Sequence, residues 1–312
     1  MTTNKLEFPV CALCGSDSRH VVHAGVQDFL CGVPGQFTVV RCTNCELVYL
    51  YPRPALETLG DYYPAHYAPF VEQKNTSQSK TYTVLRNIAH FPYRVFFGDP
   101  TSALPPFGQQ RMLDVGCGAG EYLQDMQQLG WDVHGVDLSA HAVRAAGELV
   151  GASKVWAGTL ETLDPSLKEL DLITMNHCLE HVPDPRATLE EAYRRLAING
   201  KIKIRVPDAS GFGAKIFGRY WLGWDVPRHL YDFSGQTLGK LLQQCGFCIV
   251  SSRPQYFPWL TCTSFDRAMV LGMHLRSRRI RQSIRGFVFL IALISYPFGN
   301  RGAVEMVARK VA

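Results

Sequence analysis

Three features are scarce in this 312-residue sequence: long apolar runs, an excess of one charge, and the leader pattern of an exported protein. No apolar run reaches the roughly 18 residues that a membrane-spanning helix needs, so we expect no transmembrane segment. The first residues lack the basic-then-apolar order of a signal peptide, which predicts a cytoplasmic protein. The net charge of +5 identifies no partner by itself.

Cysteine, in contrast, is plentiful, with ten residues. In the reducing cytoplasm, paired cysteine spacings indicate metal sites more often than disulfides. Two Cys-x-x-Cys pairs lie near the N-terminus, formed by Cys11 with Cys14 and by Cys42 with Cys45. Four thiolates complete the tetrahedral coordination of zinc, so the pattern predicts a zinc-ribbon-like module over residues 1–55 with a structural zinc ion. Four buried cysteines without a metal are the alternative.

A glycine-rich segment at residues 113–120, Leu-Asp-Val-Gly-Cys-Gly-Ala-Gly, follows a short apolar run and precedes a helical pattern. This order predicts a strand, a tight turn close to a ligand, and a helix. The spacing differs from the Gly-x-Gly-x-x-Gly of dinucleotide sites, and Asp114 places a negative charge where a pyrophosphate would have to bind. Asp114 suits a cationic amino-acid group, and Asp137, at the end of the next predicted strand, suits ribose hydroxyls. The two acids predict S-adenosylmethionine as the cofactor.

These motifs resemble those of class I methyltransferases. The pattern Asp-x-Gly-x-Gly-x-Gly with a strand-end acid resembles motif one of that family, and residues 176–185 resemble its Leu-Glu-His-Val and Asp-Pro segment after the fourth strand. We expect Asn176 and His177 near the methionine half of the cofactor, because open α/β sheets bind ligands at the carboxyl ends of their strands. The resemblance implies as cofactor-binding residues Asp114, Gly116, Gly118, Gly120, Asp137, Leu138, Thr159, Leu160, Asn176 and His177.

From Arg111 onward, strand and helix patterns alternate, which predicts a parallel sheet covered by helices on both faces. The predicted fold is therefore α/β, with the Rossmann-like seven-stranded sheet of class I methyltransferases in residues 109–257 and a last core strand in residues 301–312. We expect strands at residues 112–115, 133–137, 154–156, 170–175, 201–206, 248–251 and 304–308.

Two further segments surround this predicted core. Residues 56–108 are predicted to form a linker and a lid helix, and residues 258–300 a helical insertion before the last strand. The insertion places arginines between apolar runs, which suits a helix at an anionic bilayer and predicts peripheral contact with the inner face of the membrane through residues 265–298. Packing on the core or on a second subunit is the alternative. The oligomeric state stays open.

The loop at residues 221–234 is rich in aromatic and charged side chains, and we expect Trp224, Arg228 and Tyr231 to contact the substrate. A structural ion pair between Arg228 and Asp225, with His229 as a helix cap, is the alternative. The cysteine module and the Arg-His-Leu-Tyr-Asp-Phe-Ser segment are together similar to bacterial sugar C-methyltransferases. In that family the matching histidine is proposed as a general base, although a glutamate stands where this chain has Arg228.

The resemblance makes His229 the first candidate general base, and His181 is the second because imidazole titrates near neutral pH. The sequence thus predicts a methyltransferase that methylates oxygen or carbon of a small-molecule, sugar or lipid-linked glycan acceptor. An RNA methyltransferase is a second interpretation, but the cysteine module has no basic run, so we expect no nucleic-acid partner. A zinc- and nucleoside-binding scaffold without turnover is the third.

Overall fold

The computed structural model describes residues 5–63, 110–255, 258–273, 277, 284 and 302–311. Its largest sheet has the order β12-β13-β10-β9-β6-β7-β8, and among these strands β13 runs antiparallel to both neighbours. The predicted class I methyltransferase fold is confirmed. The strands are β6 (Arg111–Val115), β7 (Asp132–Asp137), β8 (Val155–Ala157), β9 (Leu170–Asn176), β10 (Leu196–Pro207), β12 (Phe247–Gln255) and β13 (Ala303–Lys310).

Most helices of the core begin where a side chain caps them. The Ser139 hydroxyl accepts a hydrogen bond from the N–H of Ala142, and the Asp184 carboxylate accepts one from the N–H of Ala187. Such caps satisfy amide groups that the first helical turn leaves without partners. The helices are α3 (Glu121–Gln128), α4 (Ala140–Val150), α5 (Pro185–Arg195) and α7 (Gly235–Gln244).

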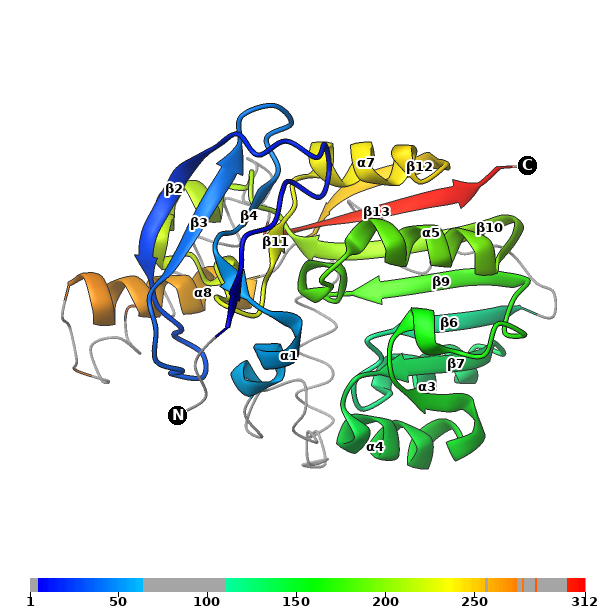
Figure 1. Ribbon diagram of the computed structural model, residues 1–312. Helices are drawn as coiled ribbons and strands as arrows, with labels where there is room; N and C mark the ends of the chain where they lie inside the picture. The colour runs from blue at the N-terminus through cyan, green and yellow to red at the C-terminus, as the bar shows by residue number, and fades with distance from the viewer. Residues whose placement is uncertain are drawn as a thin grey trace.

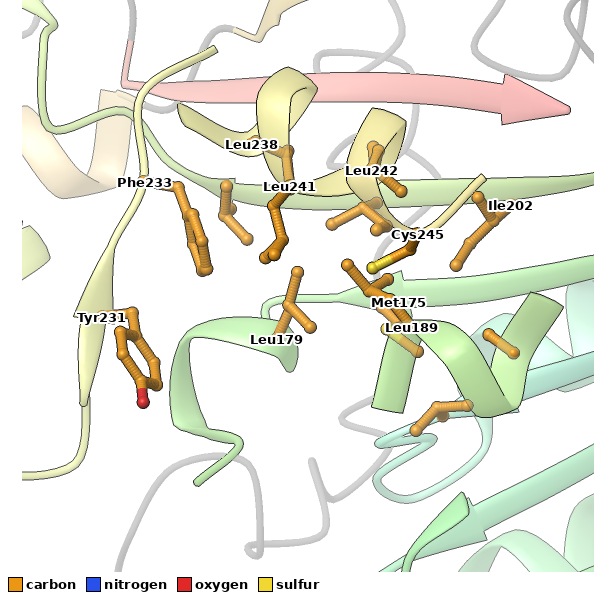
Figure 2. Packing of buried hydrophobic residues seen from close by; sticks show 14 of the residues in the cluster. Met175, Leu179, Leu189, Ile202, Tyr231, Phe233, Leu238, Leu241, Leu242 and Cys245 are labelled. Carbon is orange, nitrogen blue, oxygen red and sulfur yellow. The ribbon is translucent and has the colours of Figure 1, made fainter. Parts of the chain in front are cut away.

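Apolar side chains from helices and strands form a continuous core beside the middle of the sheet. Figure 2 shows Leu238 and Leu241 of α7 packing toward Leu179, with Met175 of β9 and Leu189 of α5 nearby. All five side chains are fully buried. This packing fixes the segment that follows β9, which contains the second candidate base.

The point where the chain reverses its direction across the sheet lies between β6 and β9. From β6 the chain continues outward to β7 and β8, and it then returns to place β9 on the other side of β6. In open α/β sheets, ligands bind in the crevice outside the carboxyl ends of such strands. The glycine-rich loop follows β6 and the residues from 176 onward follow β9, so both predicted cofactor segments meet there.

The N-terminal strands form a second sheet of order β11-β4-β3-β2. It contains β2 (Arg19–Val26), β3 (Phe37–Cys42), β4 (Val48–Leu50) and, from the loop after the core strands, β11 (Tyr231–Asp232). Figure 1 shows this sheet on the side toward which β9 points. The loop at residues 221–234 therefore joins the cysteine module to the carboxyl end of the large sheet. Smaller N-terminal elements are β1 (Leu6–Glu7), β5 (Arg53–Pro54) and α1 (Leu56–Leu59).

Parts of the predicted linker and insertion fall outside the described residues. The expected lid helix near residues 81–89 and the arginine-rich stretch at residues 276–285, of which residues 277 and 284 are described, belong to those parts. The described start of the insertion is α8 (Pro258–Arg267), which continues as a π-helical turn over Ala268–Gly272. None of the described helices has the length and hydropathy that a bilayer crossing requires. Membrane contact through residues 265–298 stays a prediction.

Candidate functional site

The glycine-rich loop turns sharply between β6 and α3. Gly116 and Gly120 have φ angles of 75° and 85°, a region that favours glycine. A Cβ atom at Gly120 would lie 2.7 Å from the Cβ of Ala146, and one at Gly116 would lie 2.9 Å from the Sγ of Cys178. Any side chain at these positions would therefore disturb both the helix packing and the contact between the loop and the segment after β9.

Asp137 is the last residue of β7, and its carboxylate binds the glycine-rich loop. One carboxylate oxygen accepts a hydrogen bond from the N–H of Gly118 at 2.9 Å, and the other accepts one from the N–H of Ser139 at 2.8 Å. Each carboxylate oxygen retains a second lone pair that can accept from a ligand hydroxyl. The next residue, Leu138, is 76 % exposed, so an apolar surface lies directly beside this acid.

Thr159 and Leu160, two of the predicted cofactor-binding residues, differ in burial and in their contacts. Thr159 is half-buried and caps the short turn at residues 160–162 together with Thr162. The side chain of Leu160 is buried in the core, and cofactor contact through this residue stays a prediction. An apolar side chain at this position is more stable in the core than at a polar ligand, so the segment can border a ligand through its backbone and Thr159.

Asp114 lies in the interior of the sheet. Its carboxylate accepts a 2.5 Å hydrogen bond from the hydroxyl of Thr174 on β9, and Asp114 is only 3 % exposed. Burial raises the pKa of Asp114 to about 7, although Thr174 and the ammonium group of Lys203 act in the opposite direction. A buried carboxyl group of this kind is ionised most readily when a cation is close to it.

Three side chains meet just after Cys178, the residue that contacts the glycine loop at Gly116: the buried Glu180 and His229 and the half-buried His181. We call them the carboxylate-histidine cluster. Glu180 and His181 lie in the 3-10 turn Leu179–His181 after β9, whereas His229 comes from the loop at residues 221–234. The N–H of Leu230 donates to the carbonyl of Glu180 at 2.8 Å, so backbone pairing keeps the two segments in register.

Backbone carbonyls fix the protonation of the two histidine rings. Nδ1 of His181 donates to the carbonyl of Arg228 at 3.1 Å and lies 3.0 Å from the hydroxyl of Tyr63. Nδ1 of His229 donates to the carbonyl of Gly223 at 2.6 Å. Since a carbonyl can only accept, Nδ1 carries the proton in both rings and Nε2 of each neutral ring keeps a lone pair. Burial, followed by the nearby His229, lowers the pKa of His181 to about 4, which keeps that ring neutral.

The loop residues expected to contact substrate are buried instead. Arg228 is 0 % exposed, and its guanidinium group donates to the carboxylates of both Asp28 and Asp225 at distances from 2.5 to 3.1 Å. Burial by itself raises the pKa of Asp28, but the hydrogen bonds from Arg228 outweigh it and hold that pKa below its usual range. The alternative that the sequence left open, an ion pair between Arg228 and Asp225, is the one that this geometry supports.

Trp224 and Tyr231 are likewise enclosed, at 2 % and 3 % exposure. The indole of Trp224 donates to the carbonyl of Gly218, and the Tyr231 hydroxyl donates to the carbonyl of Pro183 while it accepts from Arg53. The polar atoms of Trp224, Arg228 and Tyr231 are thus used in contacts within the protein, and contact of these residues with the substrate stays a prediction. His229 does not cap α7 either, since Ser234 does so.

The four N-terminal cysteines come together as predicted from their spacing. Their sulfur atoms all lie within 4.8 Å of one another, with Sγ of Cys11 3.4 Å from that of Cys45 and Sγ of Cys14 3.5 Å from that of Cys42. Three of them are buried, and Cys14 is exposed. This group, called here the cysteine cluster, has the donor set and the spacing of a tetrathiolate zinc site.

Two residues near the site were missed by sequence reasoning. Asp28 binds Arg228 across 200 positions of the chain, and Tyr63 reaches His181 from the end of the N-terminal region. Neither belongs to a motif, and a single acid or tyrosine in a polar segment carries no signal of a distant partner.

Comparison with known proteins agrees with this geometry. A family profile described as a methyltransferase domain matches residues 85–252, which is more than half of the chain. The chain belongs to this methyltransferase domain family. The prediction of a methyltransferase from the sequence is therefore confirmed.

Several bacterial relatives share the name ubiquinone biosynthesis O-methyltransferase. This chain is 24 % identical to the enzyme from Cupriavidus pinatubonensis over 187 residues, which are 55 % of this chain and 74 % of that protein. It is 32 % identical to the one from Parvibaculum lavamentivorans over 147 residues, or 44 % of this chain and 56 % of that one. Across the first four such relatives, the chain spans from 37 % to 74 % of their length.

Among solved structures, a Haemonchus contortus phosphoethanolamine N-methyltransferase 2 in complex with S-adenosyl-L-methionine matches with a TM-score of 0.47 and 20 % identity. The match covers 78 % of this chain and 60 % of the nematode enzyme.

Proposed function

We propose that this methyltransferase transfers the methyl group of S-adenosylmethionine to a hydroxyl oxygen of a small-molecule acceptor, with sugars and lipid-linked glycans within that class. The carboxylate-histidine cluster carries the proposal, because it lies beside the glycine loop at the carboxyl ends of β6 and β9. A Cβ atom at Gly116 would nearly touch Cys178, two residues before Glu180. The O-methyltransferase names of the bacterial relatives favour oxygen as the acceptor atom.

The residues at the sheet edge suit the proposed cofactor. The positive φ angles of the glycine loop leave room where a Cβ would otherwise stand, and Asp137 retains lone pairs for ribose hydroxyls. The raised pKa of the buried Asp114 suits a neighbouring ammonium group such as that of the methionine half. Asn176 and His177 are half-buried at the end of β9, where the same half is expected.

Methyl transfer is an in-line displacement, and the bound cofactor supplies an electrophilic methyl group on a positively charged sulfur. The acceptor oxygen forms a bond to the methyl carbon while the carbon–sulfur bond breaks and its electron pair goes to sulfur. The proton of the hydroxyl group must leave, and His229 is the first candidate to accept it because its Nε2 lone pair is available. His181 is the second candidate for the same reason.

The cysteine cluster is proposed to bind a structural zinc ion. All four positions of a tetrahedral zinc would be filled by thiolates, which leaves none for a reacting molecule. A metal ion supplies folding free energy to modules of this size.

A panel of hydroxyl-bearing acceptors incubated with methyl-labelled S-adenosylmethionine tests the proposed reaction. The panel contains catechols, simple phenols, free sugars and nucleotide sugars, and the products are identified by NMR. We expect a methyl ether from at least one class. Exclusive formation of carbon–methyl products would contradict the proposal and would favour the second candidate function, sugar C-methylation, which the similarity of the cysteine module and of residues 228–234 to that family supports.

A further inference from the structure

The carboxylate-histidine cluster contains a buried carboxylate that the described protein atoms partner only through a long ion pair. Glu180 is 1 % exposed, and neither of its carboxylate oxygens accepts a hydrogen bond of good geometry in the described part of the chain. Its Oε1 lies 3.4 Å from Nδ1 of His177 and 4.0 Å from Nε2 of His229. A buried carboxylate without hydrogen bonds is costly, so a native protein is expected to provide a partner for it.

The neighbouring histidines offer lone pairs more readily than protons. One nitrogen of each ring and one oxygen of Glu180 lie within 4.8 Å of one another. Because Nδ1 of both rings donates to a backbone carbonyl, Nε2 of each neutral ring is an electron-pair donor. Metal-binding histidines commonly show this pattern, in which the other ring nitrogen donates to a carbonyl and fixes the tautomer.

A protonated His229 is the competing explanation, and the geometry does not favour it. Its Nε2 lies 4.0 Å from Glu180 and 3.9 Å from Asp225, which is too far for a hydrogen bond to either. Both carboxylate oxygens of Asp225 already accept hydrogen bonds from Arg228. An imidazolium ion at this position would therefore still leave Glu180 without a hydrogen bond.

We infer that Glu180, His181 and His229 bind a divalent transition-metal ion. Two imidazoles and one carboxylate suit ions such as Mn²⁺, Fe²⁺ or Zn²⁺ better than Mg²⁺ or Ca²⁺, which prefer oxygen ligands throughout. Three protein ligands leave coordination positions open, as in catalytic metal sites. The site differs in this respect from the cysteine cluster.

The role of this ion rests on the proposed function, although its binding does not. An ion here would bind the acceptor hydroxyl and lower its pKa, so that the proton leaves to solvent before or during attack on the methyl carbon. His229 would then be a ligand instead of a general base. A second oxygen next to the reacting hydroxyl, as in a catechol or a vicinal diol, would fill another open position.

Manganese binding to the zinc-loaded full chain tests the inference. Free Mn²⁺ is measured by electron paramagnetic resonance during a titration, because thiolates bind this ion weakly. We expect one Mn²⁺ site, with affinity lowered at least about 10-fold in Glu180→Gln and in His229→Gln. His20→Gln, a change of an exposed histidine on β2, should bind as the original protein does. Calorimetry with S-adenosylhomocysteine checks that each variant is folded.

Mn²⁺ binding that is absent in the original protein, or that is unchanged in both cluster variants, would overturn the inference. Methyl transfer to a hydroxyl group that persists at full rate after exhaustive chelation, with the zinc of the cysteine cluster retained, would overturn the ion's role and leave the proposed function intact. The converse result, a Mn²⁺ site that depends on Glu180 without transfer to any hydroxyl, would contradict the proposed function and support the binding site.

Discussion

The cysteine cluster and the carboxylate-histidine cluster both gather potential metal ligands, but the chain assembles them in different ways. The cysteines come from two equivalent turns. In each, the residue four positions after the first cysteine, Gly15 or Glu46, has a positive φ angle near 70° and donates its N–H to the carbonyl of that cysteine. The other cluster joins a 3-10 turn after β9 to a loop 48 positions later.

This difference explains what each cluster is able to do. Two local turns with two sulfurs each make a closed site, which stabilises a small module and leaves no position for a reacting molecule. Two distant segments, kept in register by the backbone pairing of Leu230 with Glu180, bring three polar groups together with fewer protein ligands than a closed metal site needs. Four changes should break or sharpen this contrast, and they follow in order of decreasing effect.

The largest effect is expected from Cys42→Ser, which removes a fully buried member of the cysteine cluster. Structural zinc contributes about 10 kcal/mol or more of binding free energy in small zinc modules, so the N-terminal sheet should lose its fold. Zinc release measured with a chromogenic chelator and the near-ultraviolet circular dichroism check this result. Cys248→Ser changes an exposed cysteine of a third Cys-x-x-Cys spacing, formed with Cys245 outside the cluster, and should leave both signals unchanged.

Arg228→Met should follow, since it leaves the buried carboxylates of Asp28 and Asp225 without their cation. Removing one partner of a buried ion pair costs about 3–5 kcal/mol, and urea unfolding at neutral pH measures the change. Arg194→Met is the control: Arg194 forms an exposed pair with Glu191 on α5, and the loss should be about 1 kcal/mol or less. Equal losses in both variants would contradict the structural role of Arg228.

Asp137→Ala should abolish measurable binding of S-adenosylhomocysteine. The change removes the charged acceptor of two hydrogen bonds, which the N–H groups of Gly118 and Ser139 donate, together with the proposed acceptor for the ribose hydroxyls. Such bonds contribute about 1.5–3 kcal/mol each, so calorimetry should show affinity lowered by at least about 100-fold. Asp132→Ala, at the other end of β7, should bind normally. Normal affinity in Asp137→Ala would refute the assignment of this acid to the cofactor.

The smallest effect is expected from Asp114→Asn, which should change how the stability of the protein depends on pH. Burial raises the pKa of this acid to about 7, so the folded state binds more protons than the unfolded state between about pH 4 and pH 7. The stability that Asp114 contributes is therefore complete below its ordinary pKa and is lost as the pH rises through about 7. In thermal melts, the fall in melting temperature from pH 5 to pH 8 should be smaller in Asp114→Asn than in the original protein.

Sequence reasoning succeeded where a signal is local. The alternation of strands and helices predicted the seven strands of the sheet, and it placed β10 five residues too late because residues 197–200 form an irregular register that periodicity does not show. Cys-x-x-Cys spacing predicted which sulfurs meet. The glycine-rich turn was predictable for the same reason, since its conformation depends on the residues within it.

Sequence reasoning gave no signal where partners are distant in the chain. Aromatic and charged residues predicted substrate contact at residues 221–234, and the same composition suits the buried junction between two sheets where Trp224 and Arg228 have their partners. The pairing of Arg228 with Asp28, and of Glu180 with His229, depends on the packing of the N-terminal sheet against the core. No spacing rule encodes such contacts.

The central claim is that the carboxylate-histidine cluster ionises the acceptor hydroxyl beside the bound methyl donor. The most direct test measures methyl transfer from labelled S-adenosylmethionine to the best hydroxyl acceptor by the original protein and by Glu180→Gln, with S-adenosylhomocysteine affinity measured alongside. We expect the rate to fall by at least about 100-fold while that affinity changes little. An unchanged rate in a variant that binds the product normally would contradict the claim.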